Sequence, residues 1–282
     1  MVLKIIKKIF KKLFVKNNIQ NIKEYNTYED ALNDCSTQKA YENIELCCMI
    51  ADKTINYEKI LKDKPYLIKS SNVFLLNAIQ LHLLENCKKN ITILDFGGAC
   101  GAHYFETVNL FNNNYNVKWI VVETSEMVKS AKNHGIEDGN LVFIDNMEKI
   151  NEFIDLIYCS GALQYVSNWK LFLNNLIDIK AKYILFNRMM FNENDRTFIT
   201  IQKSKLFDNG PGLMPNNYVN KDIYYPHTTI SKNEFMNTMT EKDYNLEWIF
   251  NENSGKININ NEKIVGMGLF YKTNIGTSLN KR

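Results

Sequence analysis

The segment Ile91-Thr-Ile-Leu-Asp-Phe-Gly-Gly-Ala-Cys-Gly-Ala-His-Tyr104 has the most specific structural pattern in this chain. Its first six residues are mostly apolar, as in a strand buried on both faces, and Asp95 stands just before the glycines. The glycines predict a sharp turn, because no Cβ restricts the backbone there. The helix that follows offers free N–H groups and the positive end of its dipole. The segment therefore predicts a strand, a turn and a helix that bind an adenosine-containing ligand.

Downstream of this segment, short apolar stretches alternate with amphipathic ones. We predict strands at 117–122, 141–144, 154–159 and 183–187, and helices at 102–111, 125–134, 169–179 and 231–242. A closing pair of strands, 246–250 and 263–271, is joined by an Asn-rich loop at 251–261. This alternation is typical of an α/β fold with a parallel sheet covered on both faces. We expect a doubly wound, Rossmann-like, mostly parallel sheet of seven strands.

The remaining segments suggest a domain organisation around this core, which spans 91–272. Residues 24–90 are predicted to form an N-terminal helical cap, with helices that include 40–53 and 72–87. The stretch 188–230 contains three of the four prolines and no clear element, so we expect an irregular insertion that covers the substrate. The tail 273–282 is predicted to be loose.

Composition limits the classes of protein that need to be considered. The chain has 282 residues, 45% of them hydrophobic, and a net charge of only +3, which gives no reason to expect a nucleic acid partner. No apolar run approaches the roughly 20 residues that a membrane span needs. The six cysteines form no CxxC pair and have no zinc spacing, so we expect reduced thiols, a cytoplasmic location and no metal site.

The first sixteen residues form a basic arm. They hold six lysines and no acid, which leaves a formal charge of about −3 on the rest of the chain. Leu3, Ile6, Phe10 and Leu13 recur at helical spacing opposite the lysines. We expect 1–16 to be an amphipathic helix that lies on the anionic inner face of the cell membrane. The alternative is a helix docked on its own domain or on a protein partner.

Acidic residues end three predicted strands in succession: Asp95, Glu123 and Asp145. In an open parallel sheet the carboxyl ends of the strands face one crevice. Glu123 can accept both hydroxyls of a ribose, and Asp145 or Asn146 can reach an adenine amine. These acids would repel a pyrophosphate, so a cationic ligand without phosphates is favoured, as in S-adenosyl-L-methionine. A nicotinamide-dependent oxidoreductase is disfavoured by Asp95. The remaining alternative is a structural role, in which the three acids only cap loops.

Several motifs resemble those of class I methyltransferases. Ile93-Leu-Asp-Phe-Gly-Gly-Ala-Cys-Gly and Val121-Val-Glu resemble the first two motifs of that superfamily, and Asp155-Leu-Ile-Tyr-Cys-Ser-Gly-Ala-Leu-Gln-Tyr165 resembles the fourth-strand motif. The resemblance implies an S-adenosylmethionine-dependent methyltransferase. Its cofactor-binding set is Asp95, Gly97, Gly98, Gly101, Glu123, Asp145, Asn146 and Ser160. One departure is Ala99, which stands where the superfamily has its middle glycine; a positive φ there would weaken cofactor binding.

The resemblance extends to a narrower group of bacterial methyltransferases encoded among lipopolysaccharide and capsule genes. It is carried by Ser160-Gly-Ala-Leu-Gln-Tyr, Arg188, Asp195-Arg-Thr-Phe-Ile-Thr-Ile-Gln202 and Tyr225-Pro226. It implies a role in lipopolysaccharide or capsule biosynthesis, with O-methylation of a sugar, or of a charged substituent, on a cell-surface polysaccharide precursor. The rival interpretation is a non-catalytic scaffold of a surface-glycan assembly complex.

Methyl transfer to oxygen benefits from a base, and few candidates are present. His227 follows Tyr225-Pro226 in the insertion and is a candidate base, with loop stabilisation as its alternative. His103 follows the glycine turn and is a second candidate, or a polar residue at the lip of the cleft. Tyr165 either contacts the acceptor or only packs.

Arginine is rare in this chain, which makes Arg188 and Arg196 notable. The guanidinium group binds carboxylate or phosphate in a bidentate manner, so both are predicted to bind a substrate anion, with structural ion pairs as the alternative. Gln164 and Tyr225 complete the predicted substrate-binding set.

Overall fold

The structure is a computed structural model that describes residues 19–20, 22–35, 40–64, 69, 72–111 and 115–273. The predicted helix 1–16 and the tail after Thr273 lie outside the described residues, so neither prediction is tested.

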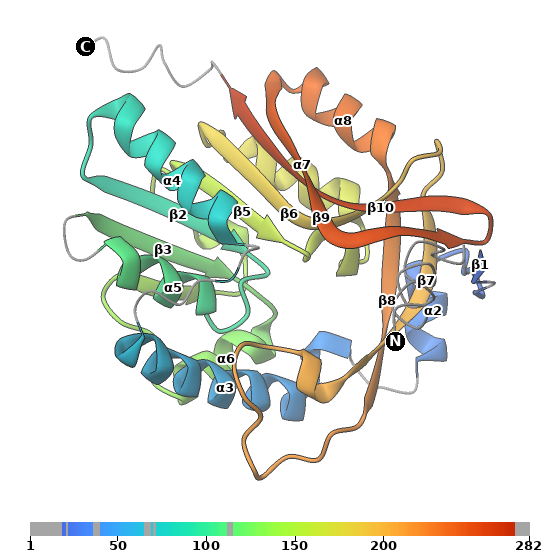
Figure 1. Ribbon diagram of the computed structural model, residues 1–282, viewed down its shortest axis with the longest axis horizontal. Helices are drawn as coiled ribbons and strands as arrows, with labels where there is room; N and C mark the ends of the chain where they lie inside the picture. The colour runs from blue at the N-terminus through green and yellow to red at the C-terminus, as the bar shows by residue number, and fades with distance from the viewer. Residues whose placement is uncertain are drawn as a thin grey trace, which may run out of the picture.

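A parallel sheet forms the centre of the molecule (Figure 1). Its order is β4-β3-β2-β5-β6, so the chain starts in the middle at β2, moves out to β4, and returns to β5 on the other side. Asp95 lies opposite Val121 on one side and Tyr158 on the other. This order confirms the predicted doubly wound, Rossmann-like α/β fold. The strands are β2 Asn90–Phe96, β3 Asn116–Val122, β4 Leu141–Ile144, β5 Leu156–Ser160 and β6 Tyr183–Asn192.

Beyond β6 the main path of the sheet continues through two antiparallel strands, β10 (Glu262–Thr273) and β9 (Tyr244–Ile259). β10 pairs antiparallel with β6 and with β9, and β1 (Ile19–Gln20) adds to the outer end of β9. The predicted Asn-rich loop at 251–261 is therefore mostly strand, with the hairpin turn at its end.

The prediction of seven strands was too low, since the described part of the chain forms a ten-stranded sheet. The stretch 188–230, expected to be irregular, contains the end of β6, β7 (Phe198–Lys205) and β8 (Asp222–Ser231). Pro226 lies inside β8 opposite Ile201, where β8 has β7 as its neighbour and has not yet reached β6. A proline is tolerated on such an edge because no second strand needs its missing N–H.

Helices cover both faces of the sheet (Figure 1). One face packs against α4, α5 and α6, and the other packs against α7 and α8. The strands are buried on both faces, which explains their nearly continuous apolar sequences. The helices are α4 Val73–Asn86, α5 Ala102–Phe111, α6 Ser125–Asn133, α7 Trp169–Asp178 and α8 Lys232–Glu241.

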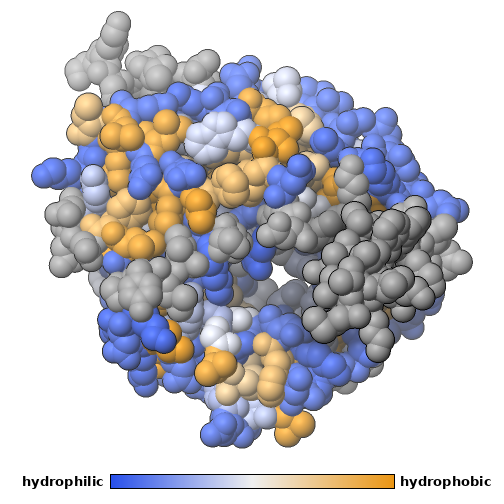
Figure 2. Space-filling model, in the orientation of Figure 1, coloured by the Kyte–Doolittle hydropathy of each residue, from blue (hydrophilic) through white to orange (hydrophobic). Residues whose placement is uncertain are grey.

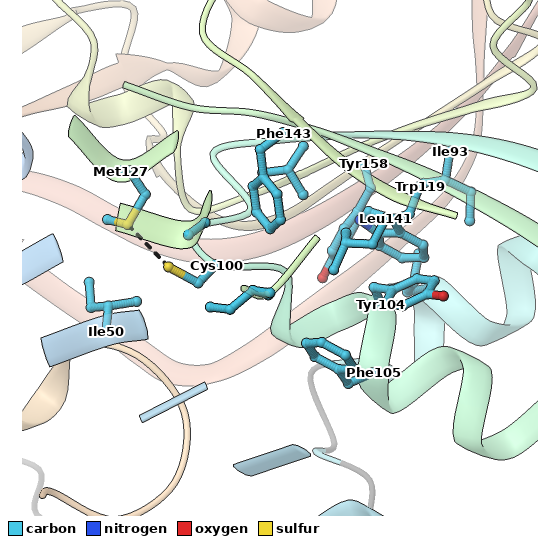
Figure 3. Close-up of a cluster of buried hydrophobic side chains, with 14 of the residues drawn as sticks. Ile50, Ile93, Cys100, Tyr104, Phe105, Trp119, Met127, Leu141, Phe143 and Tyr158 are labelled. Carbon is cyan, nitrogen blue, oxygen red and sulfur yellow. Dashed lines mark hydrogen bonds between the residues drawn. The ribbon is translucent and has the colours of Figure 1, made fainter. Parts of the chain in front are cut away.

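The core beneath the glycine turn is tightly filled (Figure 3). Trp119 and Phe143 from β3 and β4 are fully buried there. The Cys100 Sγ lies 3.6 Å from the Met127 Sδ of α6, which ties the turn to the next helix. This packing fixes the position of the turn relative to the strand ends.

The predicted helical cap contains four described elements with different partners. α2 (Tyr28–Asp34) packs against β7 and β8, and α3 (Ile44–Asp63) packs against α5 and α6. The short 3₁₀ helix η1 (Ala40–Glu42) joins them and contacts β8 and α6. α4 instead covers the sheet as an ordinary core helix. The segment before β2 therefore reaches both sides of the carboxyl edge.

The connection from β7 to β8, residues 206–221, crosses over to α3, and we name it the strap (Figure 1). Lys53 of α3 is 1% exposed, and its Nζ donates to the carbonyl oxygens of Phe207 at 2.8 Å and Asn209 at 2.6 Å. Burial lowers the pKa of this ammonium. The Tyr218 hydroxyl donates to Asp52 at 2.9 Å. These contacts fasten the strap to α3.

Among the described helices, none is both long enough and apolar enough to cross a membrane.

Candidate active site

A cavity of about 1140 Å³ opens at the carboxyl ends of β2, β3, β5 and β6, and Figure 2 shows a hollow in the face of the molecule there. This edge includes the point between β2 and β5 where the strand order reverses, the usual binding site of open α/β sheets. The walls also include residues of η1, the strap, β7, β8 and the outer β9–β10 hairpin. The cavity thus has one end at the glycine turn and another beside β7 and β8.

The glycines of the turn pack against the protein itself. A Cβ on Gly97 would lie 2.2 Å from the Ala162 Cβ, and one on Gly98 would lie 2.4 Å from an Asp95 carboxylate oxygen. Gly101 faces β4. Gly97 also lines the cavity, whereas Gly98 and Gly101 do not. The predicted close approach to a ligand therefore applies to Gly97 alone, and the other two glycines serve internal packing.

Glu123 lines the cavity and holds the turn in place. Its Oε1 accepts the Ala99 N–H at 3.0 Å, and its Oε2 accepts the Thr124 N–H at 2.9 Å. Burial raises the pKa of this carboxyl. Ala99 adopts φ +50°, the left-handed conformation that the sequence analysis associates with weaker cofactor binding. The bond from Ala99 to Glu123 keeps that residue in its strained conformation.

Asp95 and His103 lie beneath the turn, outside the cavity wall. Asp95 is fully buried, and its Oδ2 accepts the Trp119 Nε1–H at 3.1 Å and lies 2.9 Å from the His103 Nδ1. Its Oδ1 has no hydrogen-bond partner among the described residues. Both residues thus support the turn from below. This placement goes against His103 as a base and against direct contact of Asp95 with a ligand.

Asp145 and Asn146 separate in the same way. Asp145 lines the cavity and pairs with Lys149, which holds the pKa of that carboxyl below its usual range. Asn146 does not line the cavity; its Oδ1 caps a 3₁₀ turn by accepting the Glu148 N–H at 3.0 Å. Of the predicted pair for adenine, the structure brings only Asp145 to the cavity.

Arg188 brings a positive charge to the cavity wall, directly after the residues of β6 that pair with β5. Its φ is +54°, and its N–H donates to the Asn187 Oδ1 at 3.0 Å. The guanidinium donates to the Ser160 Oγ and to the Ser160 carbonyl oxygen, both at 2.9 Å. A strained residue that is held by several bonds is typical of a functional position. Ser160, which was predicted to bind the cofactor, also lines the cavity.

Arg196 lies outside the cavity. Its guanidinium bonds Glu24 at 2.6 Å and Glu262 at 2.7 Å, and Arg196 lowers the pKa of Glu24 to about 2. These contacts tie the chain before α2 to β10. The structure therefore favours the ion-pair alternative over the predicted substrate contact.

The other end of the cavity gathers the remaining predicted residues, Gln164, Tyr165, Tyr225 and His227. The Tyr165 ring lies 5.3 Å from the rings of both Tyr225 and His227, measured between centroids. Burial raises the pKa of Tyr165 to about 12 and lowers the pKa of His227 to about 4. Both side chains are therefore uncharged at neutral pH.

The residues at this end that were not predicted from the sequence include Tyr41, Thr200, Gln202 and Thr229. The Tyr41 ring of η1 lies 5.0 Å from the Tyr225 ring, measured between centroids. No local sequence pattern predicts this contact. The Gln202 Oε1 accepts the Tyr165 hydroxyl at 3.0 Å. The alternation of apolar and polar residues from Ile199 to Gln202 would have predicted a strand with Thr200 and Gln202 on one face.

Comparisons with known proteins identify similar folds. No family model matches the sequence, and no curated protein matches it. Solved structures do match over most of the chain. An S-adenosylmethionine-dependent methyltransferase from Clostridium acetobutylicum is 15% identical, with a TM-score of 0.43, over 70% of this chain and 90% of that one.

Two further structures are similar in the same way. The amino pentose methyltransferase CalS10 from Micromonospora echinaspora is 10% identical, with a TM-score of 0.44, over 73% of this chain and 92% of its own. The CcbJ methyltransferase from Streptomyces caelestis is 10% identical, with a TM-score of 0.41, over 70% and 89%. At such identities and TM-scores the likeness extends to the fold alone.

Proposed function

We propose that this protein is an S-adenosylmethionine-dependent methyltransferase (EC 2.1.1.-). The observation that carries the proposal is Glu123, whose carboxylate stands at the cavity wall beside the glycine turn, at the carboxyl edge of the doubly wound sheet. A carboxylate at this place suits the two hydroxyls of a ribose. The cavity is also larger than the roughly 300–1,000 Å³ of a typical small-ligand site, so it has room for a donor and an acceptor.

The residues at this end fit the cofactor by charge and by polarity. Glu123 and Asp145 both line the cavity, so a cationic ligand is favoured there and a pyrophosphate is not. Phe96, Val166 and Phe172 offer an apolar wall that suits the adenine ring, and Asp145 suits its amine. When bound, the cofactor would supply an electrophilic methyl group.

The end of the cavity formed by Gln164, Tyr165, Tyr225 and His227, which we name the acceptor end, supports transfer to a hydroxyl. Loss of the hydroxyl proton is assisted by a base, which typically contributes about 10²–10⁴-fold. His227 is uncharged at neutral pH, because burial lowers its pKa to about 4, and its imidazole can therefore accept a proton. Tyr165 keeps its proton and can donate a hydrogen bond to the acceptor, since its pKa is raised to about 12.

The proposed acceptor is a sugar hydroxyl, or a hydroxyl on a charged substituent, of a cell-surface polysaccharide precursor. The buried amide of Gln164 and that of Gln202 suit sugar hydroxyls, and Arg188 suits an anionic substituent. The motif resemblance to lipopolysaccharide and capsule methyltransferases supports the same acceptor class. A non-catalytic scaffold remains the second candidate, because Ala99 is strained and the pKa of His227 is low for a base.

Calorimetric titration with S-adenosylhomocysteine tests the cofactor. We expect the wild-type protein to bind, and Glu123→Ala to weaken binding by about ten- to hundredfold, the usual loss for a charged hydrogen-bond partner. Glu152→Ala is the matched control, because Glu152 pairs with Lys118 in a surface ion pair away from the cavity. Affinity left unchanged by Glu123→Ala, or binding of NAD in place of S-adenosylhomocysteine, would contradict the assignment. Methyl transfer to a glycan precursor would exclude the scaffold.

A further inference from the structure

A sheet face forms one side of the acceptor end of the cavity. Thr200 lies opposite His227, and Gln202 lies opposite Tyr225, in the β7–β8 pair. Side chains two residues apart in a strand share a face, so Thr229 lies on this face beside His227. In the neighbouring hairpin Ile264 lies opposite Ile257 and shares the cavity-facing side.

The inner part of this face is polar and has an unused hydrogen-bonding group. Thr229 is 1% exposed, and its Oγ1 has no hydrogen-bond partner among the described residues although it lines the cavity. A buried hydroxyl without a partner destabilises the folded protein. A ligand with hydroxyl groups would satisfy Thr229, and the uncharged His227 and Thr200 beside it suit the same kind of group.

The outer part of the face is aliphatic. Isoleucines from the outer β9–β10 hairpin and from the chain before α2 line it together with a methionine of β6: Ile22, Met190, Ile257, Ile259 and Ile264. The charged residues among the described cavity lining come from other strands and loops, and none comes from β9 or β10. Ile264 is 1% exposed whereas Ile257 is 39% exposed, so this apolar lobe leads from the inside of the cavity to the surface.

We propose that the acceptor is amphipathic, with a hydroxyl-bearing head between β7 and β8 and an apolar chain along the isoleucines of the outer β9–β10 hairpin. The occupant follows from continuity, because the lobe is part of the same cavity and joins the polar pocket to solvent. A head group bound at Thr229 would place its attached chain in this lobe. The inference rests on the proposed function and defines the substrate class for the same site.

Titration with n-alkyl β-glucosides of increasing chain length, below their micelle concentrations and with S-adenosylhomocysteine present, tests the proposal. The head stays constant across such a series, so only the chain is varied. We expect affinity to rise with chain length, by up to about fourfold for each methylene that is fully buried. Binding that is absent, or that does not tighten with chain length, would overturn the proposal.

Two variants assign the binding to the two parts of the face. Ile257→Asn is expected to weaken the dependence on chain length, while Ile249→Asn, an exposed isoleucine on the same strand outside the cavity, leaves it unchanged. Thr229→Val is expected to weaken binding of every member of the series equally. Because the lost hydroxyl had no partner, Thr229→Val should not lower the melting temperature, as loss of a structural hydrogen bond would.

The outcomes separate this proposal from the one on which it rests. Binding of S-adenosylhomocysteine without any response to alkyl chains overturns the amphipathic acceptor and keeps the cofactor. A chain-length response without binding of S-adenosylhomocysteine overturns the cofactor assignment and keeps the amphipathic ligand. If alkyl glucosides bind only after deletion of residues 1–16, the lobe belongs to the chain's own N-terminal segment, and the proposal is wrong.

Discussion

Ala99 is the residue at which the glycine turn departs from its usual sequence. Its left-handed φ of +50° costs an alanine roughly 1–2 kcal/mol relative to an ordinary helical conformation. Glycine has no such cost, although its unfolded chain is more flexible. We therefore expect Ala99→Gly to raise the free energy of unfolding by about 0.5–1 kcal/mol, measured by urea denaturation.

A second alanine provides the control for this change. Ala102 begins α5, where a glycine is expected to lower the free energy of unfolding by up to about 1 kcal/mol. Opposite signs for Ala99→Gly and Ala102→Gly would attribute the effect to the left-handed conformation. A loss of stability in Ala99→Gly would show that the methyl group contributes more by packing than its conformation costs.

His227 makes stability depend on pH in a predictable direction. Its pKa is about 6.5 in the unfolded chain and about 4 in the fold, because burial disfavours the charged form. Between these values the unfolded state binds the extra proton, so stability falls as the pH is lowered from 6.5 to 4, by about 3 kcal/mol in total. In His227→Leu this part of the dependence should be absent from urea denaturation series.

His82 sets the background for that measurement. Burial also lowers its pKa, so some loss of stability in acid is expected in both proteins. The quantity that tests His227 is therefore the difference in slope between the wild type and His227→Leu. Equal slopes would mean that the His227 ring takes up its proton in the fold at an ordinary pH.

At the scale of elements, the strap depends on one buried lysine. Lys53 bonds two strap carbonyls, which would lose a charged donor in Lys53→Met. We expect a loss of roughly 1–3 kcal/mol in the free energy of unfolding and faster proteolysis within 206–221. Lys59→Met, an exposed lysine on the same helix, should change neither. Cleavage elsewhere, or equal effects of both variants, would refute this role for Lys53.

The elements that the sequence predicted well are those with local signals. β2, β3 and β4 match their predicted ranges within a residue, because nearly all-apolar runs between amphipathic helices have few other interpretations. β7 and β8 were missed because the prolines around them were read as marks of an irregular segment. Pro211 and Pro215 in fact lie in the strap, and Pro226 lies on an edge.

The residues of the candidate site also differ in whether a local sequence signal predicts them. Glu123 and Asp145 were predictable because the end of a strand fixes which edge of the sheet a side chain occupies. Whether a side chain points into the cavity or beneath the turn depends on packing, as Asp95 and Asn146 show. Tyr41 reaches the site only because η1 contacts β8 and α6, a long-range contact that a single sequence does not encode in any short pattern.

For the whole molecule, the basic arm predicts membrane affinity. Each lysine near an anionic surface contributes about 1 kcal/mol at low salt. We expect the full chain to co-sediment with anionic vesicles but not with neutral ones, and deletion of residues 1–16 to abolish this without loss of S-adenosylhomocysteine binding. Unchanged co-sedimentation after the deletion would contradict the arm as the membrane contact.

The two ends of the cavity are encoded in different parts of the chain. The glycine-turn end comes from residues 96–172. Apart from Gln164 and Tyr165, the acceptor end comes from 22–50 and 188–264, on either side of that stretch. Substitutions in the flanking stretches can therefore accumulate over generations without altering the residues proposed to hold the donor. A protein built in this way can exchange one acceptor for another during evolution and keep its chemistry throughout.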